Sequence, residues 1–179
     1  MNRLPPGEIL GSAMPRHLDE RLALRFPALF RLLAGRATSL PPGAALRRRL
    51  AERSLSRGFE GLSRGDPEFL LLTMAPDVEF NYLGGGVGFA ERYRGHEGVR
   101  EFTRDWIAAW GNADYEVERV IDLGDRIVYR YKVTTSGDSS GAEVTNTQGG
   151  VAYLGDGVIR RIDTYWHWWD LVEALGLTQ

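Results

Sequence analysis

Three side chains combine acid–base chemistry with positions from which they could reach an apolar interior: Tyr82, Asp105 and His167. Tyr82 ends an alternating apolar run, so as a strand residue it would point its hydroxyl inward. Asp105 lies one helical turn from Phe102 and Ala109 and flanks an apolar stripe, which makes it a candidate pocket acid. His167 lies near the end of the last expected strand, where the rim of a pocket could include it. These three are the catalytic candidates for proton transfer.

The candidates also have structural alternatives. Tyr82 could instead be a core aromatic residue. Asp163 and His167 are four residues apart on one strand face, about 13 Å at the usual rise, which is too far for a direct pair. We therefore expect both on a solvated or dimer-facing surface. His96 is expected in the first turn of a helix, as a cap rather than a base.

Motif-like patterns elsewhere lack the context that their chemistry needs. Residues 137–141 match G-x-S-x-G, but in an expected strand–strand turn rather than a strand-to-helix turn. Residues 84–88 are glycine-rich but match neither a dinucleotide nor a phosphate loop, and fit a rim loop over a pocket. His96 and Glu97 have no second histidine at the zinc-protease spacing. With no cysteine and three scattered histidines, we expect no metal and no cofactor.

Alternation along the expected strands indicates that each strand has one buried face. In the last strand it places Thr164, Trp166 and Trp168 together on the inner face. An unpartnered charge inside would be costly, so the interior should hold rings and hydroxyls but no carboxylate. We expect a ligand pocket lined by eight residues: Phe80, Tyr82, Phe102, Trp106, Tyr129, Tyr131, Thr164 and Trp166. The alternative is that these are ordinary core side chains.

The elements that would position these residues are helices followed by a meander of strands. Apolar residues recur at helical spacing over four ranges: 17–36, with a kink or a division into two short helices at Pro27, then 44–63, 67–74 and 95–110. Alternation predicts five strands: 77–83, 115–123, 126–135, 142–154 and 158–168. A final helical turn is expected over 169–176. This order predicts an α+β fold with helices packed on one curved sheet.

Composition and charge limit the classes further. The chain has 179 residues, 43% of them hydrophobic, which is enough for one domain with an extension. There is no apolar run of about 18 residues, so we expect no membrane span. Without a secretory leader pattern, we expect a cytoplasmic protein. Residues 1–65 carry a net charge of +7, whereas residues 66–179 carry −9.

The break at residues 41–43 (Pro-Pro-Gly) divides the basic half. Residues 1–40 hold six arginines against three acids, which is too few for a convincing polyanion binder, so we expect no nucleic acid partner. This segment fits an amphipathic cap that docks on the acidic remainder of the chain or on a dimer partner. Its stripe consists of five apolar residues: Leu18, Leu22, Phe26, Leu29 and Leu33.

Five short segments carry a family pattern: RGD at 64–66, MAPDVEF at 74–80, YRGHEGV at 93–99, VIDLGDRIV at 120–128 and GVI at 157–159. In this order they resemble the SnoaL-like (polyketide cyclase-like) members of the nuclear transport factor 2-like superfamily, over about residues 46–179. The resemblance implies a cone-shaped fold, in which a curved antiparallel or mixed sheet wraps around three helices and encloses an apolar pocket. It also implies a homodimer. The break at residues 41–43 divides the chain into a helical extension over 1–43, which lies outside the resemblance, and a pocket domain over 44–179.

The resemblance also allows known active sites to be checked residue by residue. Ketosteroid isomerase-like members carry a catalytic aspartate near the end of the first strand, where this chain has Tyr82. Their two oxyanion donors fall near Gly58 and Gly149, so that enolisation chemistry is not expected. The Asp-Arg-Asp set of limonene epoxide hydrolase-like members is replaced here by Lys132, Thr134 and Thr164.

The sequence supports two functions about equally. One is a cofactor-independent isomerase, cyclase, dehydratase or hydrolase that acts on a hydrophobic ring compound near Tyr82 and Asp105. The other is a non-catalytic protein that binds a small hydrophobic molecule or dimerises. A third and weaker hypothesis is an interaction module that uses the basic N-terminal helices.

Overall fold

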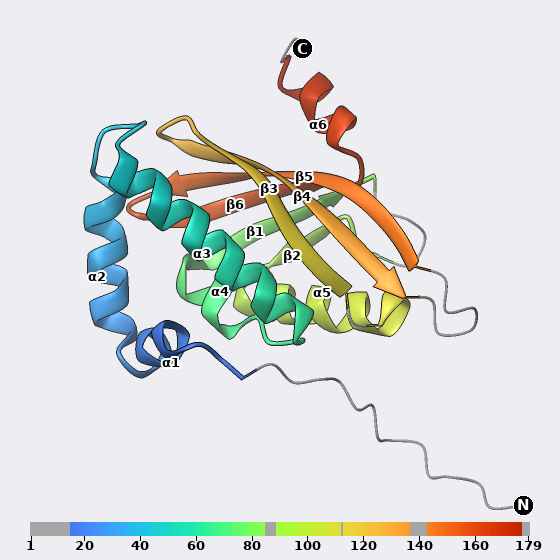
Figure 1. Cartoon of the computed structure of the whole chain (residues 1–179), viewed down its shortest axis with the longest axis horizontal. Helices are drawn as coiled ribbons and strands as arrows, with labels where there is room; N and C mark the ends of the chain where they lie inside the picture. Colours follow the sequence, from blue (N-terminus) through green and yellow to red (C-terminus); the bar gives the residue numbers. More distant parts are fainter. Residues whose placement is uncertain (1–14, 85–88, 112, 137–142, 177–179) are drawn as a thin grey trace, which may run out of the picture.

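Six strands form one curved sheet that carries the rest of the fold (Figure 1). Their order is β2-β1-β6-β5-β4-β3, and all neighbouring pairs are antiparallel except β1 and β6, which are parallel. The strands are β1 (Met74–Leu83), β2 (Arg92–Arg94), β3 (Ala113–Asp122), β4 (Arg126–Ser136), β5 (Glu143–Gly155) and β6 (Val158–Tyr165). This computed structural model describes residues 15–84, 89–111, 113–136 and 143–176. The expected α+β class is confirmed.

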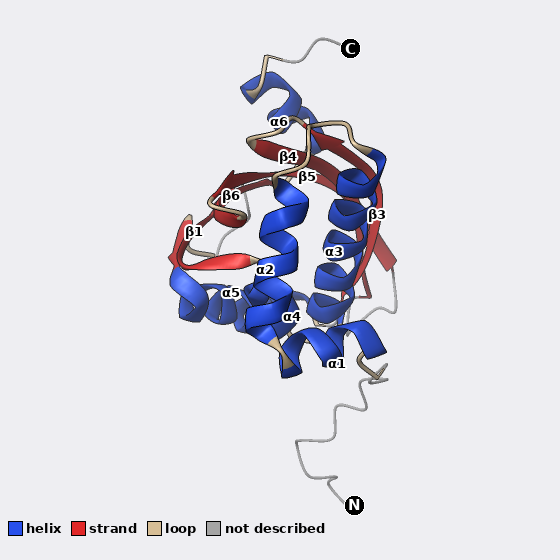
Figure 2. Cartoon of the chain, turned by 90° about the vertical axis from the view of Figure 1, so that its left-hand side faces the viewer, coloured by secondary structure: helices blue, strands red, loops and turns tan. Residues whose placement is uncertain are grey.

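Helices cover the two faces of the sheet unequally (Figure 2). The helices are α1 (Leu18–Arg25), α2 (Pro27–Thr38), α3 (Ala45–Ser63), α4 (Glu68–Leu72), α5 (Gly95–Trp110) and α6 (Trp168–Ala174). Helices α2 to α5 lie beneath the arch of the sheet, whereas α6 packs on its opposite face. Of the helices described, none is long and apolar enough to cross a membrane.

Most expected elements match the observed ones within a few residues, and the differences have local causes. Of the two outcomes expected at Pro27, a kink or two short helices, the structure shows two helices: Phe26 separates α1 from α2, and Pro27 takes the first helical position, where its missing N–H matters least. The sequence predicts no strand at β2, because three residues carry no period. Strand β6 ends at Tyr165 because the chain turns there into α6, which begins at Trp168.

Two expectations lie outside the described residues. The G-x-S-x-G pattern at 137–141 is one of them, and most of the expected rim loop, residues 85–88, is the other.

Strand alternation places a large aromatic core on the concave face and a small cluster on the other. Tyr129 and Tyr131 belong to the concave core, as expected, together with rings from α3 and α5. The opposite cluster is built on Val128 and Val151 of the sheet. The prediction that Trp168 shares the inner face is wrong, because Trp168 opens α6 and packs against this outer cluster.

Two adjacent glycines of β5 make room on the two faces. A Cβ on Gly150 would lie 2.7 Å or less from ring atoms of Tyr129 on the concave side. A Cβ on Gly149 would lie 2.8 Å from the ring of Trp168 and 2.9 Å from Leu171 of α6. Packing on both faces therefore requires two consecutive residues without side chains.

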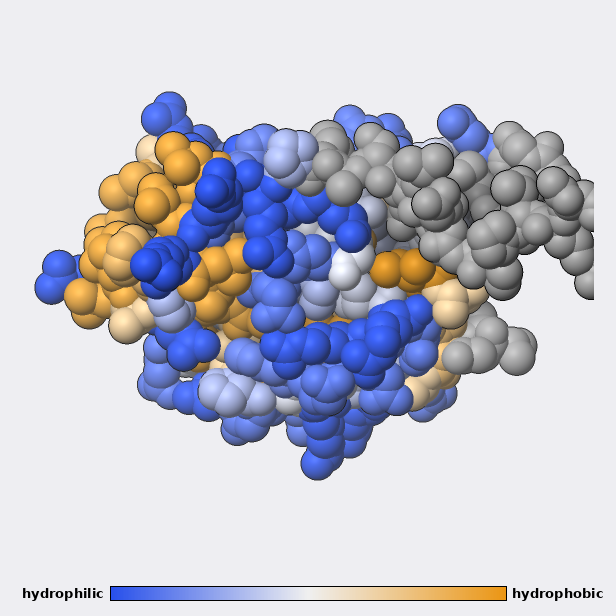
Figure 3. Space-filling model, turned by 90° about the horizontal axis from the view of Figure 1, so that it is seen from below, coloured by the Kyte–Doolittle hydropathy of each residue, from blue (hydrophilic) through white to orange (hydrophobic). Residues whose placement is uncertain are grey.

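The apolar stripe of the N-terminal helices faces away from the described remainder of the chain. Its five residues are at least half exposed, from 51% at Leu22 to 70% at Leu18. Figure 3 shows apolar residues gathered at the end of the molecule that α1 and α2 form. The expectation that this stripe docks on the pocket domain is therefore wrong; docking on a dimer partner stays a prediction.

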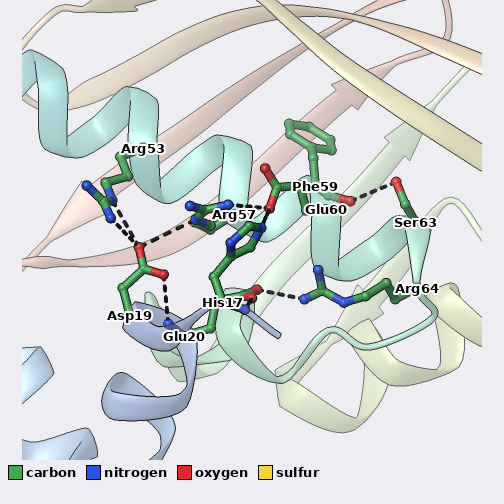
Figure 4. A network of polar contacts seen from close by, with 9 residues as sticks. All are labelled: His17, Asp19, Glu20, Arg53, Arg57, Phe59, Glu60, Ser63 and Arg64. Atoms are coloured by element: carbon green, nitrogen blue, oxygen red, sulfur yellow. Dashed lines mark hydrogen bonds and ion pairs between the residues drawn. The ribbon is translucent and has the colours of Figure 1, made fainter. Parts of the chain in front are cut away.

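Ion pairs hold α1 in place instead (Figure 4). The carboxylate of Glu20 is fully buried and accepts hydrogen bonds from Arg64 at 2.7 Å and from the backbone N–H of His17 at 2.6 Å. Asp19 pairs with Arg53 of α3 at 2.7 Å. The acids of α1 thus contact arginines in and just after α3, whereas Arg16, just before α1, pairs with Asp66 at 2.6 Å in the polarity expected for a basic segment on an acidic one.

A buried arginine fixes the connection between α2 and α3. Arg47 forms an ion pair with Asp122 at the end of β3, with 2.7 Å between Nε and Oδ2. Its guanidinium also donates to the carbonyl oxygens of Thr38 and Leu40, at 2.6 and 2.9 Å, and to that of Gly124. These contacts join the end of α2 to the turn between β3 and β4.

Candidate functional site

An aromatic cavity of about 50 Å³ lies between α3, α4, α5 and the concave face of the sheet. Seven rings line it: Phe59, Phe80, Phe102, Trp106, Tyr115, Tyr129 and Tyr131. Gln148 and Thr164 are its polar members. Among the residues that the structure describes, no carboxylate lines this cavity. A lining of rings with few polar groups is typical of sites that bind small apolar molecules.

Six of the eight residues expected to bind a ligand line this cavity: Phe80, Phe102, Trp106, Tyr129, Tyr131 and Thr164. The other two, Tyr82 and Trp166, lie behind Trp106, with ring centroids 6.0 and 6.2 Å from that of Trp106. They complete an edge-to-face aromatic cluster next to the cavity wall.

Three buried donors around the cavity lack a hydrogen-bond partner within the described part of the chain. The hydroxyl of Tyr131 donates to Oε1 of Gln148 at 2.8 Å, which leaves the Nε2 group of Gln148 unused. The indole Nε1 of Trp106 and the hydroxyl of Tyr82 are also unpartnered. The Tyr82 hydroxyl lies near Gln148 but forms no hydrogen bond of acceptable geometry with it. Such groups cost stability unless an acceptor reaches them.

The tyrosines act as neutral phenols. Burial raises the pKa of Tyr82 and that of Tyr115 well above the ordinary value of 10.0. Burial likewise raises the pKa of Tyr129 and that of Tyr131. Because the charged form is disfavoured, these hydroxyls can donate hydrogen bonds but cannot serve as phenolate bases at physiological pH.

The three predicted catalytic residues do not come together. Tyr82 adjoins the aromatic cavity, as described above. Asp105 lies outside the cavity lining, and its Oδ2 accepts a hydrogen bond from the hydroxyl of Tyr93 at 3.2 Å. His167 is exposed just before α6 and lies in a shallow surface hollow with Trp168 and Trp169. A direct triad among the three is therefore absent from this structure.

The other polar candidates have structural contacts. Asp163 lies on the outer face, where it is buried and accepts a hydrogen bond from Asn81 at 2.7 Å. His96 begins α5, and its Nε2 lies 3.3 Å from the carbonyl oxygen of Met74 in β1. Among the described residues, no group of three histidine or carboxylate side chains could hold a metal ion.

Gln148 is the site residue that sequence reasoning missed. It is 1% exposed and stands in β5 opposite Tyr131. Its position was visible as an amide on the same strand face as the apolar Ala152, four residues later. Without a known partner strand, however, that face could not be assigned to the tyrosines.

Comparison with known proteins identifies one sequence family and a set of solved structures that resemble this chain. The sequence model of the family described as "SnoaL-like domain" matches residues 55–162. No curated protein matches the chain. Solved structures do match, and their identities below 25% support the fold alone.

Three of these structures illustrate the likeness. The first is TerC co-crystallised with polyporic acid, 23% identical over 70% of this chain and 97% of its own, with a TM-score of 0.57. The second is an NTF2-like protein from Burkholderia pseudomallei K96243, 19% identical over 68% and 94%, with a TM-score of 0.58. The third is a protein with a ketosteroid isomerase-like fold from Catenulispora acidiphila DSM 44928 in complex with trimethylamine, 11% identical over 70% and 93%, with a TM-score of 0.55.

Proposed function

Because the chain belongs to the SnoaL-like domain family, we propose that its aromatic cavity binds a small cyclic, hydrophobic molecule that carries a hydrogen-bond acceptor. The supporting observation is the set of buried donors on Tyr82, Trp106 and Gln148 that have no partner within the described part of the chain. A ligand carbonyl or ether oxygen would satisfy at least one of them, while its ring would pack among the aromatic side chains. Two structural neighbours were crystallised with small molecules, which agrees with a ligand-binding use of the fold.

The chemistry that such a cavity could add is polarisation of the bound acceptor. Neutral donors aimed at a developing oxyanion stabilise it in a site without water. Among the described residues, no side-chain base lines the cavity. A proton removed from a bound substrate would therefore have to pass to another group of the same substrate or to water. Catalysis through the hydroxyl of Tyr82 is the finer part of this proposal, and Asp105 and His167, which lie outside the cavity lining, take no part in it. It predicts that Tyr82→Phe removes any turnover found with a bound ring compound.

A matched pair of ligands tests the binding proposal. Acetophenone carries a ring and a carbonyl acceptor, whereas ethylbenzene has nearly the same shape without the acceptor. We expect calorimetric titration to show acetophenone binding about tenfold more tightly, since a hydrogen bond to an unpartnered buried donor contributes about 1–1.5 kcal/mol. Gln148→Leu should reduce that ratio toward one.

Trp110→Phe is the control, because Trp110 is partly exposed and lies outside the cavity lining. This variant should keep the wild-type preference for the ketone. Equal affinity of the wild-type protein for the two ligands, or binding of neither, would contradict the proposal.

A further inference from the structure

We infer that the N-terminal helices add a second compartment to the binding cavity, which takes an alkyl tail on the ring compound; the inference rests on the proposed function. A cavity of about 110 Å³ lies between α2, α3, α4 and the sheet. Helix α2 supplies one wall through Phe30, Ala34 and Ala37, and α3 supplies another through Leu50 and Ala51. This aliphatic compartment exists because the chain has helices ahead of α3.

One layer of side chains lies between the aliphatic compartment and the aromatic cavity. Leu55, Leu70, Ala152 and Ile159 line both of them. The two spaces therefore share one layer of side chains. Two of these four residues, Leu55 of α3 and Leu70 of α4, are only partly buried. A molecule whose ring lies among the tyrosines could extend a flexible chain past these residues without leaving apolar surroundings.

The lining of the aliphatic compartment is mainly apolar and suits a methylene chain; its polar members are Arg31, Thr38, Arg47, Ser54 and Thr73. Phe30 is the one aromatic residue among its described lining residues. Three of its polar side chains already have partners. Arg47 is bound to Asp122 and to backbone carbonyls, as shown above, and the hydroxyl of Thr38 donates to the Gly35 carbonyl at 2.8 Å. The hydroxyl of Thr73 donates to the Leu70 carbonyl at 2.7 Å.

The difference in lining sets the orientation of the ligand. Unpartnered donors stand beside the aromatic cavity on Trp106 and Gln148. The acceptor-bearing ring therefore belongs among the aromatic side chains, and the tail points toward α2. The substrate class that fits both spaces is an alkyl-substituted cyclic ketone, quinone or similar acceptor.

A series of 4-alkylacetophenones tests this inference by calorimetric titration. Each methylene removed from water adds about threefold to fourfold in affinity. If every added carbon is removed from water, we therefore expect 4-hexylacetophenone to bind roughly 700-fold more tightly than acetophenone, and 4-butylacetophenone roughly 80-fold more tightly. Equal affinities across the series would overturn the inference.

Two matched variants place the tail. Ala34→Phe fills the aliphatic compartment from α2 and should remove the gain from chain length while leaving acetophenone binding unchanged. Ala28→Phe adds the same ring to an exposed position of α2 outside the compartment, and should change neither. Ala51→Leu fills the compartment from the opposite wall, so it repeats the test if Ala34→Phe folds poorly. A chain-length gain that persists in the filled variants would overturn the inference.

The outcomes separate the two proposals. If acetophenone binds but longer chains bring no gain, the ring site stands and the aliphatic compartment fails. If only the longer ketones bind, and Ala34→Phe abolishes that binding, the proposal of a tail compartment is supported. The proposal that the donors beside the aromatic cavity bind the ring compound is then contradicted. Binding of no ketone at all would overturn both.

Discussion

Beneath the sheet, Trp106 and Gln148 keep buried donors without partners among the described residues, whereas Arg47 at the joint after α2 contacts three carbonyl oxygens and Asp122. Both regions are buried, and both lie against the same sheet. The opposite charges of the joint pair with each other without any further molecule, so its contacts serve stability. The aromatic cavity is incomplete, because the free energy of its open donors can be recovered only when an acceptor enters.

This comparison also explains how the N-terminal helices can shape a binding site while their leucine stripe faces outward. Ion pairs at Glu20 and Arg47 fix the backbone of the extension. The side of α2 that carries Ala34 then faces the core and leaves a space there. The ion pairs fix the position of the N-terminal helices, and the apolar side chains of α2 line the space that these helices enclose.

The largest effect is expected at the joint. Arg47→Ala leaves the carboxylate of Asp122 buried without its partner, which should lower the free energy of unfolding by about 3–5 kcal/mol. Urea denaturation followed by circular dichroism measures the change. Arg48→Ala is the control, because Arg48 is 57% exposed and its contact to Glu52 is 3.8 Å long. The control should change stability by less than about 0.5 kcal/mol; similar losses in the two variants would remove the distinction between the joint and the surface.

A smaller effect is expected inside the aromatic cavity. Gly150→Ala places a methyl group against the ring of Tyr129, which should lower the free energy of unfolding by about 1–3 kcal/mol through overpacking. The displaced ring should also weaken acetophenone binding. Gly35→Ala in α2 is the matched control, because a Cβ there has nothing within 4 Å and alanine favours a helix. An unchanged melting temperature in Gly150→Ala would show that the cavity tolerates rearrangement.

The smallest effect is expected at an exposed ion pair. Hydrogen bonding from Arg100, at 2.8 Å, holds the pKa of Glu68 below its ordinary value of 4.5. A lowered pKa contributes stability that is present above about pH 4.5 and is lost as the pH falls through the folded-state pKa. Glu68 is 40% exposed, so solvent screening should limit the contribution to less than about 1 kcal/mol.

Unfolding measured between pH 6 and pH 3 tests this prediction. The stability advantage of the wild-type protein over Glu68→Gln should shrink as the pH falls. A difference in stability between the wild-type protein and Glu68→Gln that increases as the pH falls would contradict the prediction. The buried pair at Arg47 provides the contrast, since its removal should matter far more at neutral pH.

Much of the fold and part of the site followed from local patterns. Alternation put Tyr129 and Tyr131 on the inner face, and helical spacing put Phe102 and Trp106 toward the same interior. Both inferences need only the geometry of one strand or one helix. The break at Pro27 likewise followed from the missing N–H of proline.

Contacts between distant segments could not be inferred in this way. The pairing of Arg47 with Asp122 joins residues 75 positions apart, and Gln148 meets Tyr131 only because β4 and β5 pair in one particular register. Trp168 took the outer face because the strand ended three residues earlier than its alternation indicated. The direction of the leucine stripe depended on which side of α1 and α2 the ion pairs fixed.

The sequence by itself therefore determined the class of the fold, the inward faces of its strands and the aromatic character of its interior, because these depend on neighbours along the chain. The tertiary structure decided which polar atoms were left without partners and where α2 left a space. Those features depend on strand register and on long-range ion pairs, which no local period encodes.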